Sequence, residues 1–402
     1  MKHLFPLRIN SSITNHKRIQ KTTKYGFVID DKELIDLTSN LSTTPIGYNR
    51  YDIIDHVADS LKNSLVCPTE IEMDTIDVEL LSENIYKETQ AYSIYSLSGS
   101  DSIETAIRCC EIYHNGTRKN IISFHGSYHG SNLLNLKLSN INPATGDRTG
   151  PSPAGFIHLR NTNQYISIED FEYQTLKEVK SHFETGTISC IIQETSCWLA
   201  GFITPSINYW KELRKLCNQY DVLLIIDDMA ICGGKTGNLY GFEIVPDIFC
   251  VGKAFSGGYF PLSVCGISEK VYDNIKNKHF NHSYTHSFHL PGIVAANYYH
   301  KILEKENILD RVPNIVEDMK TVCEDLPIQS FNNCGIMFSL KLRKLLDTKK
   351  VDSVFQNFGL NKGLIMNEPM TDTIVWCGSF AADEEYYSKI KKGLQYSLKT
   401  LY

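Results

Sequence analysis

The sequence predicts an α/β protein in which helices flank a mainly parallel β-sheet. Short, continuously apolar runs indicate strands that are buried on both faces, as strands in parallel sheets are. Stretches with helical periodicity lie between these runs, and this alternation is typical of βαβ units. The predicted strands are residues 120–124 (NIISF), 188–194 (ISCIIQE), 222–227 (VLLIID), 248–252 (IFCVG) and 263–268 (SVCGIS).

The stretch 206–220 shows the helical periodicity between two of these strands. Its sequence is SINYWKELRKLCNQY, and one helical face carries Trp210, Leu213, Leu216 and Cys217. We therefore expect an amphipathic helix that covers the sheet.

The two ends of the chain predict a smaller α+β region. Residues 25–38 (YGFVIDDKELIDLT) indicate a hairpin that turns at Asp30 and Asp31. A helix at 291–306, strands at 336–342 and 373–379, and a helix at 383–402 follow near the C-terminus. We expect residues 1–50 to pack with a small domain of residues 296–402, and residues 51–295 to form the large domain.

The composition argues against several classes of function. The 402 residues are 42% hydrophobic and 21% charged, which is typical of a globular protein with a large core. A net charge of −6 without Lys/Arg blocks argues against a nucleic acid or an anionic membrane as partner. The chain has neither 18 successive apolar residues nor the apolar core of a signal peptide, so we expect a cytoplasmic protein. Its twelve cysteines contain no CxxC pair and are expected to be reduced.

Charged side chains follow two of the predicted strands. Asp227 and Asp228 end the strand at 222–227, and Lys253 follows the strand at 248–252. Ligands bind at the carboxyl ends of parallel strands, so these groups are candidates for chemistry. A salt bridge at the rim of the sheet would explain the same pattern.

The segment 96–113 (SLSGSDSIETAIRCCEIY) predicts a helix that begins after Ser98, Gly99 and Ser100. Serine there is an ordinary helix cap. The free amides and the dipole of the same turn also favour an anion, and a glycine lets the backbone approach it, so the turn is a candidate phosphate site.

A glycine-punctuated loop, HGSYHGSN (125–132), presents Tyr128 and His129 after the strand at 120–124. An aromatic side chain there could stack on a heteroaromatic ring or simply pack on the protein surface. His125, His129 and the histidines of 279–289 also raise the question of a metal. The spacing is broken by glycine and includes no clear carboxylate ligand, so we expect no metal site.

A site for pyridoxal phosphate needs the four features described above: a phosphate-binding turn, a stacking aromatic side chain, an aspartate and a lysine. From about Tyr25 to the C-terminus, the sequence resembles the class III aminotransferases of fold type I, the ornithine, acetylornithine and glutamate semialdehyde type. SGSDSIETAIR (98–108) resembles the family's SGSEAxEAAxK, and SFHGSYHG (123–130) resembles FxGxYHG. IIDDMAICGGKTG (225–237) follows LIxDEVQxGxGRTG, and HSYTHSFHLPGIVAA (282–296) aligns with HGFTxSGNPxACAA. PDIFCVGKAFSGGYFPLS (246–263) follows PDIxxxGKxxGGGxPxG with an extra Phe260.

The resemblance implies a seven-stranded sheet, pyridoxal phosphate as cofactor and a role for each matching residue. Lys253 would form the Schiff base and shuttle a proton, Asp227 would pair with the pyridine nitrogen, and Tyr128 would stack on the ring. Thr285 would reach the phosphate of the neighbouring subunit, which implies a homodimer with active sites at the interface. The remaining positions implied to bind cofactor are Ser98, Gly99, Ser100, His129, Glu194 and Ala230.

The sequence departs from the family pattern where a substrate carboxylate is normally held. Ala230 stands in place of a glutamine, and Thr195 in place of a proline. Leu199 and Val375 replace a gate glutamate and its arginine partner, so both charges are lost together. We expect Trp198 and Trp376 to form an aromatic wall for a flat or weakly charged substrate, unless both simply pack in the core.

The favoured function is an aminotransferase that moves an amino group from a small-molecule amine or amino acid to a carbonyl acceptor. The missing arginine is also a feature of glutamate semialdehyde aminomutases, so an aminomutase, a cyclase or a decarboxylase is an alternative. A non-catalytic paralogue is a third possibility, which the retained Lys253 and Asp227 disfavour.

Overall fold

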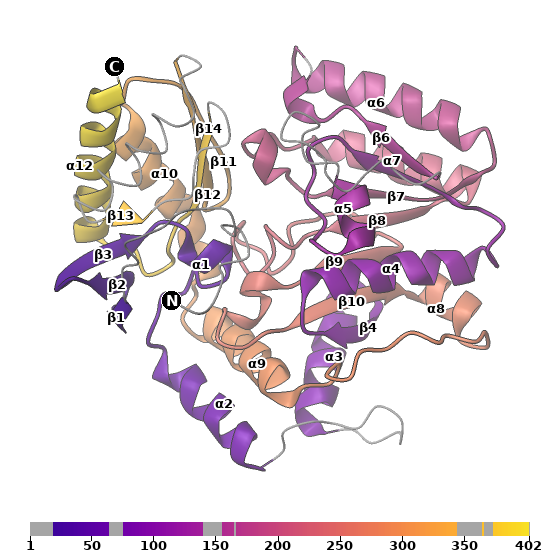
Figure 1. Cartoon of the computed structure of the whole chain (residues 1–402), viewed down its shortest axis with the longest axis horizontal. Helices are drawn as coiled ribbons and strands as arrows, with labels where there is room; N and C mark the ends of the chain where they lie inside the picture. The colour runs from indigo at the N-terminus through magenta and orange to yellow at the C-terminus, as the bar shows by residue number, and fades with distance from the viewer. Residues whose placement is uncertain are drawn as a thin grey trace.

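The computed structural model describes residues 19–63, 75–139, 155–164, 166–343, 364–365 and 373–401. The predictions made for residues 1–18 and for Tyr402 lie outside these ranges. A large sheet with helices on both faces forms one part of the molecule, and two smaller sheets with helices form the other (Figure 1).

The large sheet has seven strands, as predicted. In order across the sheet these are β4 (Ala91–Ser96), β10 (Ser263–Ser268), β9 (Ile248–Val251), β8 (Leu223–Asp227), β7 (Ile188–Glu194), β5 (Asn120–Phe124) and β6 (Phe156–Leu159). The five strands from β9 to β6 are parallel, and β10 runs antiparallel to both of its neighbours. β10 reverses because only a short segment joins it to β9, whereas a parallel connection needs a longer crossover.

Helices cover both faces of this sheet. α4 (Gly99–Tyr113), α5 (Leu133–Ser139) and α8 (Glu269–Ile275) contribute to the apolar core on one face. α3 (Ile76–Thr89), α6 (Ile168–Phe183), α7 (Ile207–Tyr220) and α9 (Leu290–Lys305) contribute to the core on the other. Strand residues alternate between the two cores: Leu223 and Ile225 join the first, and Leu224 and Ile226 join the second. The helix predicted at 206–220 is α7.

The smaller part of the molecule contains two sheets. One is formed by β11 (Ile328–Cys334), β12 (Met337–Leu342) and β14 (Thr373–Cys377), beside α10 (Val312–Cys323) and α12 (Glu384–Leu401). The other is formed by β1 (Ile19–Thr22), β2 (Gly26–Ile29), β3 (Lys32–Asp36) and β13 (Leu364–Ile365). The predicted hairpin is β2 and β3, and its turn residues Asp30 and Asp31 both have left-handed backbones (φ 51° and 60°).

The N-terminal segment lies against the C-terminal part. The amide of Cys377 donates to the carbonyl of Leu37 (3.0 Å), and the amide of Phe380 donates to that of Pro45 (2.8 Å). The core between them also includes Ile53 of α2 (Tyr51–Asn63) and Tyr299 of α9. The domain boundaries at residues 50 and 295 stay predictions.

Two further features concern the helices and the cysteines of the described ranges. None of the helices in the described ranges is long and apolar enough to cross a membrane. The cysteines within these ranges are unpaired, and all except Cys334 are buried.

Candidate active site

Lys253 lies where β9 ends, at the start of the 3₁₀-helix η6 (Lys253–Ser256). Its backbone is left-handed (φ 45°), a conformation that non-glycine residues rarely adopt and that is enriched at functional sites. Burial lowers the pKa of the Lys253 amine, and the nearby cation of Lys235 lowers it further.

Asp227 is the last residue of β8 and is 4% exposed. Because β8 and β9 are parallel neighbours, with Asp227 paired to Cys250, the carboxylate and Lys253 follow the same edge of the sheet. One carboxylate oxygen, Oδ2, lies 2.7 Å from Nδ1 of His129, and the other accepts the amide of Met229 (3.1 Å). His129 is also buried, so this contact is shielded from water and fixes the direction of the carboxylate.

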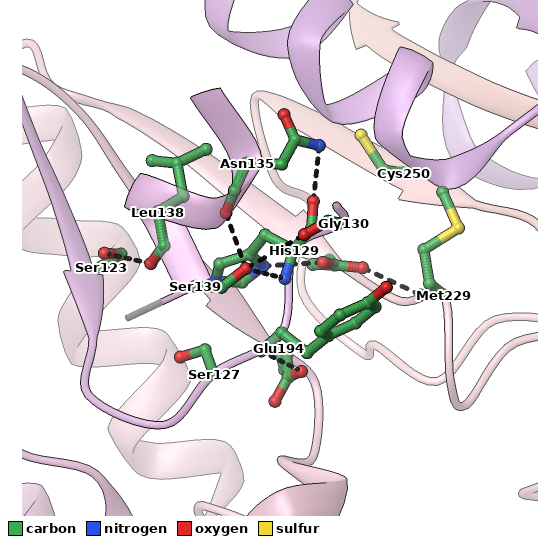
Figure 2. Close-up of polar contacts among 12 residues, drawn as sticks. Ser123, Ser127, His129, Gly130, Asn135, Leu138, Ser139, Glu194, Met229 and Cys250 are labelled. Carbon is green, nitrogen blue, oxygen red and sulfur yellow. Dashed lines mark hydrogen bonds and ion pairs between the residues drawn. The ribbon is translucent and has the colours of Figure 1, made fainter. Parts of the chain in front are cut away.

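The loop that carries His129 is anchored by hydrogen bonds from α5 (Figure 2). Ser139 Oγ accepts the amide of His129 (2.8 Å), and Asn135 Nδ2 donates to the carbonyl of His129 (2.6 Å). The same amide group of Asn135 donates to the carbonyl of Ser100, the second residue of α4 (3.0 Å). One side chain therefore holds the loop and the start of α4 together.

The start of α4 is capped as the sequence suggested. Ser98 Oγ accepts the amide of Asp101 (3.2 Å) while its own backbone stays extended. The first amides of a helix have no acceptor within the helix, which leaves those of Gly99 and Ser100 for an anion. At Gly99, a Cβ would lie 3.0 Å from Sδ of Met229, so glycine suits the close packing against this side chain.

Glu194 ends β7, one strand beyond Asp227, and is 7% exposed. Its Oε1 accepts the amide of Tyr128 (3.1 Å), while Oε2 is buried without a partner among the described residues. Burial raises the pKa of this carboxyl to about 7. Glu194 therefore positions Tyr128 and keeps one oxygen for another group.

Tyr128 and Trp198 lie edge to face, with ring centroids 6.4 Å apart. The Tyr128 hydroxyl is hydrogen-bonded to Ser131 (2.7 Å), and Nε1 of Trp198 is buried without a partner in the described part of the chain. Leu199, next to Trp198 in the 3₁₀-helix η5 (Trp198–Ala200), is half-buried.

Trp376 lies in the apolar core of the smaller part, and Trp198 packs against the same core from outside. Trp376 is 1% exposed and packs against Phe338, its partner across the sheet, in the core with α10 and α12. Val375 occupies the opposite strand face beside Ser339, whose hydroxyl donates to the carbonyl of Gly201 (2.7 Å). Strand alternation therefore directs Val375, rather than Trp376, toward the loop of Trp198.

Two further buried charged residues lie beside the site: Lys235, which the sequence analysis did not single out, and Asp228, which it named only as a charge at a strand end. Lys235 is fully buried, and its Nζ donates to the carbonyls of Ala230 and Cys232 (both 2.9 Å). Asp228 accepts the hydroxyl of Thr195 (2.7 Å) and the amide of Gly241 (2.8 Å), and burial raises its pKa to about 7. The available signal was their position shortly after the apolar run 222–226.

Ala230 and Thr285 are the last two of the predicted cofactor-binding residues. Ala230 is half-buried and packs against the core of the smaller part, while Thr285 is exposed on the segment 279–289. Within the described ranges, no three His, Cys, Asp or Glu side chains are placed to hold a metal ion.

The arrangement fits pyridoxal phosphate. Adjoining segments supply three groups that this cofactor needs. These are helix amides suited to a phosphate, a buried carboxylate suited to a protonated ring nitrogen, and a lysine with a lowered pKa. Oε2 of Glu194 and Nε1 of Trp198 are buried without partners in the described residues, so both are free to bond a group that enters the site.

Comparisons with known proteins agree with this chemistry. The omega-amino acid–pyruvate aminotransferase of Pseudomonas putida is 26% identical over 78% of this chain and 76% of its own. Gamma aminobutyrate transaminase 2 of Solanum lycopersicum is 25% identical over 82% of this chain and 78% of its own. An amine transaminase from an uncultivated Pseudomonas species, solved with pyridoxal phosphate bound, has the same fold (TM-score 0.90, 20% identity, 100% and 99% of the two chains). The family model of class-III aminotransferases matches residues 15–395, so the chain belongs to this family of pyridoxal phosphate-dependent aminotransferases.

Proposed function

We propose that this aminotransferase takes its amino group from amines whose reacting carbon carries no carboxylate, and passes it to a small carbonyl acceptor. The observation that carries the proposal is Val375, an uncharged side chain on the strand face directed toward the Trp198 loop. By resemblance, ornithine-type enzymes have an arginine there, and Leu199 replaces its glutamate partner. A carboxylate buried against Val375 and Leu199 would gain no cation from either position and would lose its hydration.

The names of two relatives support this donor class. Omega-amino acids and gamma-aminobutyrate carry the amino group away from the carboxylate, and the aminotransferases named for them are similar to this chain. We therefore propose that the protein differs from the ornithine and acetylornithine branch in how it treats an α-amino acid such as glutamate, whose reacting carbon carries a carboxylate.

We propose the following roles toward the cofactor. The Asp227 carboxylate holds the proton of the ring nitrogen, and His129 orients that carboxylate through its 2.7 Å contact. Tyr128 covers the ring, and the first amides of α4, after Ser98, hold the phosphate. When bound, pyridoxal phosphate supplies an aldehyde that takes up the amino group and a protonated ring that stabilises negative charge on the substrate carbon.

Lys253 moves the proton in this proposal. Its lowered pKa leaves more of the amine neutral near pH 7, and a neutral amine can both bind an aldehyde and accept a proton from carbon. Trp198 forms the apolar side of the substrate site next to Leu199, without a contribution from Trp376.

We also propose the setting of the enzyme. A homodimer in which Thr285 of the partner subunit reaches the phosphate is consistent with the exposure of this residue. A cytoplasmic location agrees with the unpaired cysteines in the described ranges.

The test is the absorbance of the bound cofactor during half-reactions. We expect a primary amine or gamma-aminobutyrate, added alone, to bleach the lysine-bound form, and a separate carbonyl acceptor to restore it. Lys253→Ala should lack the lysine-bound spectrum from the start. A faster half-reaction with glutamate than with any omega-amine would contradict the proposed donor class.

An aminomutase is the second candidate, because the same uncharged position 375 is expected in that branch of the family. The half-reactions separate the two functions. A mutase would turn over one substrate without any added acceptor, whereas the proposed aminotransferase would stop at the bleached form.

A further inference from the structure

A cavity of about 760 Å³ lies at the opposite edge of the large sheet from Lys253. It is open to solvent on one side and lined by the last turns of α4, the start of β5, Ser189 near the start of β7, and residues 278–279 after α8. α8 (Glu269–Ile275), which precedes residues 278–279, lies beside α4 (Figure 1). A volume of this size is in the range of sites for small molecules.

The cavity is well separated from the candidate active site. Ser189 precedes Glu194 by five residues of one strand, a distance of roughly 17 Å. Glu111, on the cavity side of α4, lies twelve residues after Gly99, roughly 18 Å along the helix. A molecule in the cavity would therefore not touch the groups assigned to pyridoxal phosphate.

The walls combine an apolar surface with positive charge. Ile107, Ile112 and Ile121 supply apolar surface, and Glu111 supplies the one carboxylate among the lining residues of the cavity. The cations that line it are Arg108, Arg118, Lys119 and Lys278. Because the whole chain carries a net charge of −6, this surplus of positive charge is local.

Two of these cations are held in place by backbone carbonyls. Nη1 of Arg118 donates to the carbonyls of Tyr220 (2.9 Å) and Asp221 (2.7 Å). Nζ of Lys278 donates to the carbonyls of Ile112 (3.1 Å) and Tyr113 (3.2 Å) at the end of α4. Arg118 is also ion-paired, because its Nη2 lies 3.8 Å from Oδ2 of Asp221, whereas Lys278 has only neutral partners and keeps its attraction for an anion.

The other two cations differ in their partners. Arg108 is paired with Glu111 on the same helix (2.8 Å). Lys119 is exposed, and its amine makes no hydrogen bond or ion pair with the described residues. Lys119 is therefore the cation most available to an incoming ligand.

Ser189 provides an independent sign of a ligand. It lines the cavity, is 3% exposed, and its Oγ has no hydrogen-bond partner among the described residues. Buried hydroxyl groups are nearly always paired, because losing water without a replacement is costly. The backbone carbonyl of Ser189 already accepts a hydrogen bond from Nε2 of His114 (3.0 Å). The side-chain hydroxyl of Ser189 is therefore the group that remains for another molecule.

We propose that this cavity is a second binding site, for a small organic anion that joins an apolar ring or chain to a phosphate or carboxylate group. The apolar body would lie on Ile107, Ile112 and Ile121, and the anionic group would meet Lys119 and its neighbouring cations. The Ser189 hydroxyl would bond a polar atom at the inner end.

The test uses the full-length, cofactor-loaded enzyme and the probe 1-naphthyl phosphate, with binding measured by calorimetry. Loading keeps the phosphate site at α4 occupied. Inorganic phosphate and 1-naphthol test the two halves of the probe separately. The variants are Lys119→Glu and Ser189→Ala. The control is Lys177→Glu, because Lys177 is an exposed lysine on α6 that belongs to neither site.

We expect saturable binding of 1-naphthyl phosphate, tighter than that of phosphate or naphthol by roughly ten-fold, because two kinds of contact add. Lys119→Glu should weaken binding roughly five-fold, and Ser189→Ala roughly two- to ten-fold. Lys177→Glu should leave it unchanged, and a saturating amine donor should not displace the probe.

Three results would overturn the proposal. These are the absence of probe binding, equal losses in Lys119→Glu and Lys177→Glu, and displacement of the probe by the amine donor. A shift in oligomeric state with Lys119→Glu and no probe binding would instead assign the cavity to a subunit contact.

Discussion

Lys253 is surrounded by charges of both signs. Burial lowers its pKa most, Lys235 lowers it further, and Asp227, Glu194 and Cys232 act in the opposite direction. Lys235 is linked to the reactive lysine through Cys232. Its amine donates to the carbonyl of Cys232, and the thiol of Cys232 donates to the carbonyl of Gly252 (3.2 Å), the residue before Lys253. A fully buried lysine next to the reactive lysine therefore helps to lower the pKa of the amine.

We therefore predict that Lys235→Met raises the pKa of Lys253, because it removes a buried positive charge. Uptake of pyridoxal phosphate by the cofactor-free enzyme requires the neutral amine, so its rate profile should move to higher pH and uptake at neutral pH should slow. Lys235→Arg keeps the charge and should keep the profile. A profile unchanged in Lys235→Met would show that burial alone sets the pKa.

The carboxyl of Glu194 predicts a pH dependence of stability. Its pKa rises from 4.5 to about 7 on folding, so the folded protein binds a proton more tightly than the unfolded chain. Stability should therefore be lost as pH rises from about 4.5 to about 7, by up to ~3 kcal/mol from this group. Glu194→Gln keeps the acceptor for the Tyr128 amide and should flatten this part of the curve.

The measurement for Glu194 is thermal unfolding of the cofactor-free protein between pH 4.5 and 7.5. Asp228 also has a pKa raised by burial to about 7, so part of the slope should remain in the Glu194→Gln variant. If the stability of Glu194→Gln fell with pH as steeply as that of the unmodified protein, Glu194 would be ionised throughout this range.

The central strands were predictable because buried parallel strands are continuously apolar. β5 and β7 have the predicted bounds, and β8 and β9 differ from the prediction by one residue. β4 (AYSIYS) and β6 (FIHL) were not predicted, since these edge strands mix polar with apolar residues. The direction of β10 was also not predictable from its apolar run, because that pattern does not report on strand direction.

The contact between the start of α4 and the Tyr128 loop depends on Gly130. Its φ is 112°, and a Cβ would lie 2.4 Å from Oγ of Ser100 and 2.5 Å from Nδ2 of Asn135. We predict that Gly130→Ala destabilises the protein by roughly 2–4 kcal/mol and weakens cofactor binding, because α4 must move. Thermal unfolding and cofactor titration would measure both effects.

Gly126, in the same loop, is the matched control. It also has a left-handed backbone (φ 73°), but a Cβ would meet no atom within 4 Å. Gly126→Ala should cost only the backbone strain, roughly 1 kcal/mol, and leave cofactor binding nearly intact. Equal losses in the two variants would mean that the clash with α4 does not matter.

The sequence motifs identified residues of the site but not how the whole molecule arranges them. Spacing predicted that Asp227 and Lys253 share a sheet edge, because both follow parallel strands. The burial of Lys235 and the orientation of Trp376 depend instead on how the smaller part packs against the larger one. Alternate residues of β14 face the site and the helices, so a shift of one residue in register would exchange the two sets. The local sequence contains no signal that fixes this register.

The proposed homodimer makes a testable claim about Thr285. This residue is exposed, and its hydroxyl has no hydrogen bond within the described part of its own chain. If it binds the phosphate, Thr285→Ala should weaken cofactor affinity roughly ten-fold, since hydrogen bonds to charged groups are strong. The enzyme should also sediment at twice the chain mass of 45.7 kDa.

Mixed dimers decide whether Thr285 acts across the interface. When Thr285→Ala chains are mixed with Lys253→Ala chains, each hybrid dimer contains one site that combines an intact Lys253 with an intact Thr285 from the other subunit. That site should bind the cofactor tightly and show the lysine-bound spectrum, which gives up to one such site per hybrid dimer. If Thr285 served its own chain, no site in the hybrid would hold both residues, and the weak binding of the Thr285→Ala enzyme would persist.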